Sequence, residues 1–202
     1  MTKEIKAPKL PKQWSSGSKD DKNSPRLYIQ NQVDELVLPI SGGWGYSVDD
    51  CVVIDKNDSS VDTSVPFKGV PIEYQFIEKR IYAELIVFKS EADKSSGIQW
   101  ELLSQMCEAI DGKTYDILDF KVTAYKDDDW NYLKKDWADN DGFKDNPSGL
   151  KNHTEERDSR MYFYNAQFWF DITSFHDGAT EGENKTLGSY TPEKKGTKYP
   201  RR

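Results

Sequence analysis

The chain has 202 residues, of which 36% are hydrophobic, 31% charged and 13% aromatic, and its formal net charge is −7. This length fits one domain with terminal extensions, and the aromatic content excludes a chain that is disordered throughout. No run approaches the roughly 20 apolar residues of a membrane helix, and the charged N-terminus lacks the apolar core of a secretion signal. We therefore expect a cytoplasmic protein.

The charges are distributed unevenly. Residues 1–26 carry seven basic and three acidic side chains, residues 185–202 carry six and one, and residues 27–184 carry 15 and 31. An acidic body repels the phosphates of nucleic acids and anionic membranes, and it attracts basic proteins. We expect a basic protein as the partner, and neither a nucleic acid nor a membrane. A role of the acidic surface in solubility alone stays open.

The two ends differ in composition from the centre. Residues 1–25 contain Lys, Pro, Ser and Asp with few apolar side chains, and the residues from 178 onward are mainly Gly, Thr, Lys and Pro. Segments of this kind bury too little apolar surface to order themselves. We expect a flexible N-terminal arm over 1–25, a single domain over 26–177 and a flexible C-terminal tail over 178–202.

The first predicted elements of the domain are short. Ser24 followed by Pro25 is typical of a helix start, and apolar residues at helical spacing predict a short helix over 26–37, with a strand as the alternative. The Gly-rich segment 39–45 predicts a loop. The apolar run 50–55 predicts a short buried strand.

The strongest pattern in the front half is an alternation of apolar and polar residues. Apolar side chains occupy every second position in two runs, namely Val70, Ile72, Tyr74 and Phe76, then Ile81, Ala83, Leu85 and Val87. This period is typical of strands with one buried face, and a charged break separates the runs. The sequence therefore predicts an antiparallel hairpin over 70–87.

A second hairpin is predicted further along the chain. Residues 98–110 and 118–124 both contain alternating apolar side chains, although the first run also fits a helix. The pair Asp111-Gly112 between them is typical of a tight hairpin turn, which favours two strands.

A helix is predicted directly after this hairpin. Asp127 is expected to cap it, and Asp128 and Asp129 complement the helix dipole in its first turn. Trp130 and Trp137 are seven positions apart and therefore lie on one helical face.

The last part of the domain is predicted to be a polar loop over 139–159 followed by an aromatic strand over 160–175. The whole order of elements lacks the regular strand–helix alternation that builds a parallel sheet. We therefore expect an α+β fold, with a mainly antiparallel sheet and one or two short helices.

No motif in the sequence dictates a chemistry. The segment 41–46 has the spacing GGxG, which is neither GxGxxG nor GxxxxGKS, so it is not a phosphate loop. The Asp-rich segment 55–62 lacks the Gly and Glu of an EF-hand, and an Asx-rich turn is favoured. Cys51 and Cys107 have no second Cys or His at ligand spacing. We expect buried thiols, with a disulfide between them as the alternative, and we expect no metal site and no cofactor.

Catalytic pairs are also scarce. The two histidines are His153, in the predicted loop, and His176, after the predicted strand. A Cys–His or Ser–His mechanism requires partners that are close in space, and no serine lies in a GxSxG elbow. We expect a protein that is not an enzyme. An enzyme that uses one of these histidines with a carboxylate is the alternative.

Aromatic side chains and carboxylates remain as candidates for contact with a partner. Trp and Tyr are enriched at binding hot spots, and carboxylates attract basic surfaces. The candidate partner-binding residues are Trp44, Tyr46, Asp127, Asp128, Asp129, Trp130 and Trp137. For Trp44 a place in the core or in a turn is favoured over an interface, and for the aspartates the helix dipole is a sufficient reason.

The acidic body, the many aromatic residues and the missing catalytic signature favour a protein-binding inhibitor that neutralises a basic toxin or enzyme, as a bacterial immunity protein does. Basic nucleases bind phosphate, so an acidic protein can occupy the same surface and associate with it quickly. The alternatives are a small-molecule or carbohydrate-binding module and a structural subunit of a phage or secretion assembly, whose basic arms order on binding.

Overall fold

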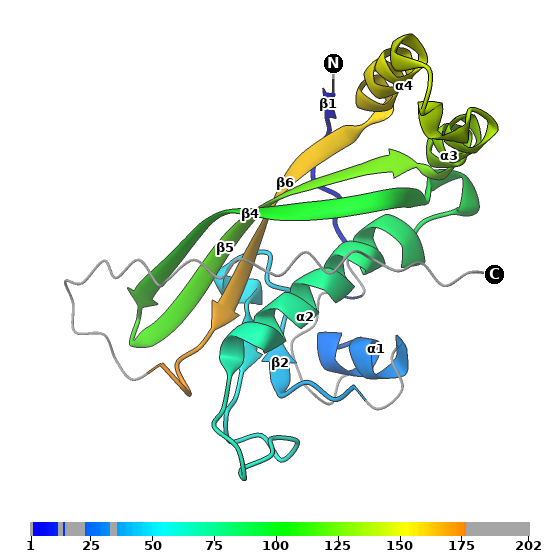
Figure 1. Ribbon diagram of the computed structural model, residues 1–202. Helices are drawn as coiled ribbons and strands as arrows, with labels where there is room; N and C mark the ends of the chain where they lie inside the picture. Colours follow the sequence, from blue (N-terminus) through cyan, green and yellow to red (C-terminus); the bar gives the residue numbers. More distant parts are fainter. Residues whose placement is uncertain (1, 12–13, 15–22, 33–35, 177–202) are drawn as a thin grey trace.

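The computed structural model describes residues 2–11, 14, 23–32 and 36–176 (Figure 1). In chain order, its main elements are β1 (Lys3–Glu4), α1 (Pro25–Gln32), β2 (Ile40–Gly42), β3 (Val52–Ile54), α2 (Gly69–Tyr82), β4 (Ser95–Ile110), β5 (Lys113–Lys126), α3 (Asp127–Asp139), α4 (Pro147–Arg160) and β6 (Tyr162–Asp171). The tail predicted over 178–202 lies outside the described residues.

The strands form one mixed, mostly antiparallel sheet in the order β2-β3-β6-β5-β4, with β1 beside β6. β1 and β3 run parallel to β6, and the other neighbours are antiparallel. α2 lies along one face of the sheet, and α3 and α4 lie together beyond one end of the long strands (Figure 1). The α+β class is confirmed, but the described part of the chain contains four α-helices, so the prediction of one or two short helices is wrong.

The hairpin predicted over 70–87 is wrong, because this segment forms α2 and then a π-helical turn at Ala83–Val87. The buried residues of α2 follow helical spacing, and they are Gly69, Glu73, Phe76, Ile77, Arg80 and Ile81. Two of them, Glu73 and Arg80, are charged. A pattern of apolar residues therefore misses the buried face of this helix.

The core lies between α2 and the sheet and is rich in aromatic rings. The ring centroids of Phe76 and Phe170 are 5.7 Å apart, and those of Tyr74 and Phe120 are 6.0 Å apart. The largest fully buried side chains include Trp44, Tyr164, Phe76, Phe120, Phe168 and Phe170. Each such side chain contributes roughly 2–3 kcal/mol by leaving water, so this layer is the main source of stability.

The predicted hairpin in the back half is confirmed. β4 and β5 pair up to Ile110 and Lys113, and Asp111 and Gly112 between them have φ angles of 50° and 77°. Positive φ at both central residues is the geometry of the two-residue turns that suit twisted strands. The strands predicted over 50–55 and 160–175 are also present, as β3 and β6.

The loop predicted over 139–159 is wrong from Pro147 onward, because α4 begins there. The side-chain oxygen of Asn146 accepts a hydrogen bond of 2.8 Å from the backbone N–H of Gly149. Proline has no N–H to lose at a first helical position, so Pro147 fits the start of a helix. The residues that suggested a loop therefore begin a helix.

The described residues before β2 include β1 and α1. The side chain of Ser24 accepts a hydrogen bond of 3.3 Å from the N–H of Leu27, which confirms the predicted helix start. The N–H of Lys3 donates to the carbonyl of Met161 at 3.1 Å, as β1 joins the sheet.

Candidate functional site

α3 and α4 are held together by side chains that are buried between them. Leu133, Phe143 and His153 are all buried. Nδ1 of His153 lies 2.6 Å from Oδ2 of Asp136, and the His153 ring lies 5.2 Å from the Phe143 ring. His153, expected in a polar loop, is therefore a buried residue that fixes α4 against α3.

A groove of about 410 Å³ lies between the two helices. Its apolar lining consists of Trp130, Leu133, Trp137 and Leu150. Trp137 and Leu150 are 47% and 40% exposed. Large apolar side chains that are exposed together, rather than singly, mark surfaces for contact with other molecules. The groove therefore brings together two of the predicted partner-binding residues, Trp130 and Trp137.

The remaining lining of the groove is polar. Lys134, Thr154 and Arg157 stand around it, and the Arg157 guanidinium donates to the Asp158 carboxylate at 3.0 Å. The aliphatic stems of Lys and Arg add apolar surface while their charged ends stay in water. An apolar centre with a polar rim is the usual anatomy of a protein–protein interface.

Acidic side chains outnumber basic ones on this helix pair. Residues 127–160 contain ten acidic and six basic side chains. Ion pairs such as Lys135–Asp139, at 2.5 Å, join some of them at the surface. Such exposed pairs are weak and leave the net charge unchanged, so the helix pair as a whole is negative, although the charged side chains that line the groove itself are the basic Lys134 and Arg157.

The three predicted aspartates at the start of α3 have different surroundings. Asp127 accepts a hydrogen bond of 2.5 Å from the Ser96 hydroxyl, and Asp129 forms an ion pair with Arg160. Asp128 is exposed. Asp127 is the first residue of the helix rather than its cap, and all three lie in the first turn, where they complement the dipole. Of the three, Asp128 is the one with its carboxylate open to a partner.

Trp44 and Tyr46, the other predicted contact residues, lie away from this groove. Trp44 is fully buried, with its ring 5.4 Å from that of Tyr28. The Tyr46 hydroxyl donates to the Glu84 carboxylate at 2.6 Å and accepts from the N–H of Leu10 at 2.9 Å. Trp44 is therefore a core residue, the interpretation that the sequence already favoured.

An arginine holds this Gly-rich segment in place. The Arg80 guanidinium donates to the backbone carbonyls of Trp44 and Gly45 at 2.9 and 3.1 Å, and to the Glu84 carboxylate at 3.0 Å. It also stacks 3.9 Å from the centre of the Tyr46 ring. These contacts explain the segment as structural, so it is not part of the candidate site.

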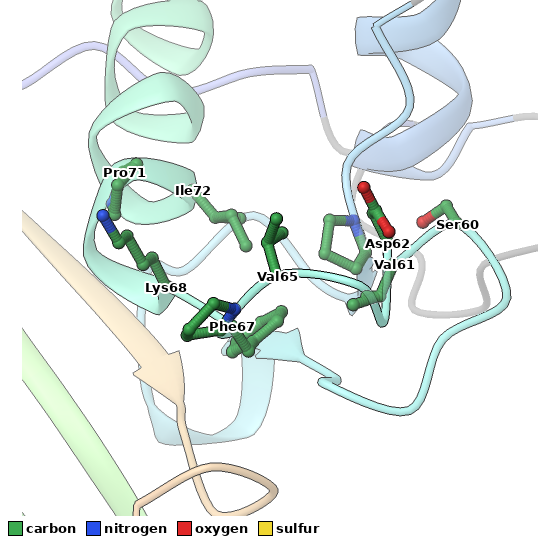
Figure 2. Close-up of a pocket in the computed structure, with 10 residues that line it drawn as sticks. Ser60, Val61, Asp62, Val65, Phe67, Lys68, Pro71 and Ile72 are labelled. Atoms are coloured by element: carbon green, nitrogen blue, oxygen red, sulfur yellow. The ribbon is translucent and has the colours of Figure 1, made fainter.

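A second cavity, of about 610 Å³, lies between segment 60–68 and the start of α2 (Figure 2). Figure 2 shows Val65 beside Ile72 of α2, with Phe67 below them. Most of the lining is apolar, and none of the predicted partner-binding residues belongs to it. This cleft suits an apolar molecule better than a polar one.

The Asp-rich segment 55–62 folds as Asx turns, as the sequence favoured. The Asp55 carboxylate accepts from the N–H of Asn57 at 2.9 Å, and the Asp58 carboxylate accepts from the N–H of Ser60 at 2.9 Å. Within the described residues, no group of three His, Cys, Asp or Glu side chains is arranged to hold a metal ion. The helices that the structure describes are also too short or too polar to cross a bilayer.

One further pair of residues, Cys107 and His176, has no signal in the sequence pattern. Cys107, expected to be buried, is exposed, and its sulfur lies 3.8 Å from Nε2 of His176. The two residues are far apart in the chain and come together only through the pairing of β4, β5 and β6.

Comparisons with family models, curated proteins and solved structures found no match for this chain.

Proposed function

We propose that this protein binds a basic protein through the groove between α3 and α4, and that it acts as an inhibitor of a basic toxin or enzyme, in the manner of an immunity protein. The observation that carries the proposal is the exposure of Trp137 and Leu150 beside an apolar groove, on a helix pair with an excess of acidic residues.

The groove supplies the apolar part of the interaction. An aliphatic or aromatic side chain of the partner can enter it and cover Trp137 and Leu150. Removal of this apolar surface from water contributes about 25 cal/mol for each Å². Buried Trp residues at the centre of an interface are frequent hot spots, where truncation costs about 2 kcal/mol or more.

The negative charge of the protein raises the rate of association with a basic partner and contributes to specificity. The body of the protein, residues 27–184, has 31 acidic and 15 basic side chains. A negative surface attracts a cationic one over a Debye length of about 8–10 Å, which raises the association rate and makes it sensitive to salt. A toxin or enzyme that binds phosphate needs a cationic surface of this kind, so covering that surface blocks its substrate.

Capture from a cell lysate tests the proposal, with three forms of the full-length protein as bait. The wild type and Tyr132→Ala should retain one basic protein in stoichiometric amount, elute it as salt rises, and inhibit its activity after purification. Trp137→Ala should lose it. Tyr132 is a matched control, because it is an exposed aromatic of α3 that does not line the groove.

Two outcomes of this capture contradict the proposal. In the first, Trp137→Ala retains the same partner as the wild type, which removes the groove from the interaction. In the second, the retained protein is acidic or binds equally at all salt concentrations, which removes the electrostatic part.

A second candidate function is the binding of a small apolar molecule in the cleft of Figure 2, supported by its volume of about 610 Å³ and its apolar lining. Volumes of about 300–1,000 Å³ are typical of ligand sites. A panel of apolar compounds should raise the Tm of the wild type and not that of Ile72→Asp. No rise for any compound would count against this function.

A further inference from the structure

Four ionisable side chains come together near the turn between β4 and β5. They are Glu73 of α2, Cys107 of β4, Asp116 of β5 and His176 after β6. Cys107 and Asp116 are directly opposite each other in the paired strands, so their side chains lie on the same face of the sheet. Asp116 alternates with the core residues Leu118 and Phe120, which places this face towards α2.

Cys107 and His176 have the geometry of a nucleophile and its base. The sulfur lies 3.8 Å from Nε2 of His176, and Cys107 is exposed, so a substrate can reach it. A positioned histidine can take the proton of a thiol as the sulfur attacks. The other ring nitrogen of His176, Nδ1, is buried and has no hydrogen-bond partner in the described structure.

Asp116 lies opposite Cys107 in the paired strands, and one of its carboxylate oxygens has no hydrogen-bond partner among the described residues. Its Oδ2 accepts a hydrogen bond of 2.6 Å from the Gln105 side chain, whereas Oδ1 is buried and has no partner among the described residues. His176 interacts with it electrostatically and lowers its pKa, although burial dominates and raises that pKa to about 6. A buried polar atom without a partner costs about 1–3 kcal/mol, so unpaired atoms on two interacting residues call for an explanation.

The carboxyl groups of Glu73 and Asp116 differ in protonation at neutral pH, and Asp116 is the one that carries a negative charge. Glu73 is almost completely buried, and one of its oxygens has no partner in the described structure. Burial, and then the charge of Asp116, raise the pKa of Glu73 to about 8. At pH 7, Glu73 therefore keeps its proton, while Asp116 is mostly ionised, and its charge can stabilise the imidazolium that forms when His176 takes a proton, although no hydrogen bond joins the two residues in the described structure.

We propose that Cys107 is a nucleophilic thiol with His176 as its base and Asp116 as a positioning residue, and that this site takes the acyl group of an activated ester or thioester. The site is separate from the groove between α3 and α4, and the proposal does not depend on that function.

The acylation step involves one proton and one acyl group. The thiol proton of Cys107 moves to Nε2 of His176 as the sulfur forms a bond to the carbonyl carbon. The bond from that carbon to its leaving oxygen or sulfur breaks, and the leaving group takes the proton from His176. Water then attacks the acyl carbon while His176 accepts its proton, the bond from that carbon to the Cys107 sulfur breaks, and the proton passes from His176 to the sulfur, which releases the carboxylic acid.

The base is needed because the thiol is not ionised in advance. Burial, and then the charge of Asp116, raise the pKa of Cys107 above its ordinary value. The thiolate is the nucleophilic form of cysteine, so the uncatalysed reaction at neutral pH is slow. A proton acceptor within reach of the sulfur provides a route that does not require a free thiolate.

The experiment is acylation of the full-length protein by p-nitrophenyl acetate, followed by peptide mass spectrometry. Cys51, which is buried, is the internal control and should stay unmodified. Cys107 should be acylated in the protein that retains Cys51, and His176→Gln should slow this reaction about 100-fold, the low end for general base catalysis. Equal rates with and without His176 would overturn the proposal.

Asp116→Asn tests the positioning role. Loss of the charge should lower the pKa of the Cys107 thiol and shift the pH profile to lower pH, and loss of the support for His176 should also lower the maximal rate of acylation, which the change in thiol pKa alone does not do. An unchanged maximal rate of acylation in a folded Asp116→Asn protein overturns the assignment of Asp116 as a positioning residue. If the Asp116→Asn protein does not fold, the His176→Gln variant still tests the central proposal, because His176 is only partly buried.

Discussion

Nδ1 of His153 lies 2.6 Å from the carboxylate of Asp136, across the contact between α4 and α3. The pair is packed beneath Trp137, whose ring lies 5.5 Å from that of His153. The orientation of the exposed Trp137 therefore depends on a polar contact at the base of the groove. This relationship connects the stability of the helix pair to the shape of its binding surface.

Asp136→Ala should loosen α4 without unfolding the sheet. The substitution leaves the buried His153 without its hydrogen-bond partner, which costs about 1–3 kcal/mol. Hydrogen exchange at the backbone amides of α4 should become faster. Asp139→Ala is the control, because Asp139 is exposed and pairs only with Lys135 at the surface. Equal exchange in both variants would show that His153 is held by packing alone.

Arg80→Ala should be the most damaging single substitution in the core. It removes the positive charge that neutralises Glu84 in an ion pair of 3.0 Å buried on both sides, and leaves Glu84 with the Tyr46 hydroxyl as a neutral donor. An unpaired buried charge of this kind costs about 3–5 kcal/mol. The double variant Arg80→Met with Glu84→Met should lose less in urea denaturation, since no charge is left unpaired. A larger loss in the double variant would contradict this account.

The stability of the protein should fall as pH rises towards 8 and beyond. The folded-state pKa of Glu73 is raised from 4.5 to about 8, so folding retains a proton that the unfolded chain releases between these values. The stabilisation is complete below pH 4.5 and is lost as pH passes 8; the difference is on the order of 5 kcal/mol. Asp116, with a pKa raised to about 6, contributes in the same direction at lower pH.

Glu73→Gln separates this effect from the general charge of the protein. The variant carries no titrating group at position 73, so it should match the wild type near pH 4.5 and be more stable than the wild type at pH 9. Urea denaturation at both values gives the comparison. An equal change in the free energy of unfolding between pH 4.5 and pH 9 in the two proteins would show that Glu73 is ionised in the folded state.

Asn146→Ala should destabilise α4 by about 1 kcal/mol, because the side chain of Asn146 accepts from the N–H of Gly149 at the helix start. Asn152→Ala, at an exposed position within α4, is the matched control and should have little effect. Equal thermal shifts for both variants would mean that the cap contributes nothing measurable.

The sequence predicted the elements whose signals are local. Asp111 and Gly112 marked a hairpin turn because both positions need positive φ, and Ser24 with Pro25 marked a helix start for the same kind of local reason. α2 was missed because Glu73 and Arg80 occupy its buried face. Charged residues hide the helical period there, while Val70 to Phe76 imitate the period of a strand.

The candidate site was predictable only in part. Trp130 and Trp137 were identified from their shared helical face, but the second wall of the groove comes from α4, which the pattern around Asn146 concealed. The contact of Cys107 with His176 depends on the order of the strands in the sheet. A single sequence contains no local signal for that order.

The most direct test of the central claim is the affinity of the captured basic partner for Trp137→Ala, compared with the wild type and Tyr132→Ala. If the groove between α3 and α4 is the binding site, Trp137→Ala should raise Kd by about 30-fold, the effect of losing about 2 kcal/mol at a hot spot. Tyr132→Ala should stay within about twofold of the wild type, as expected for a residue outside the contact. An unchanged Kd for Trp137→Ala, in a protein with the wild-type Tm, would contradict the account.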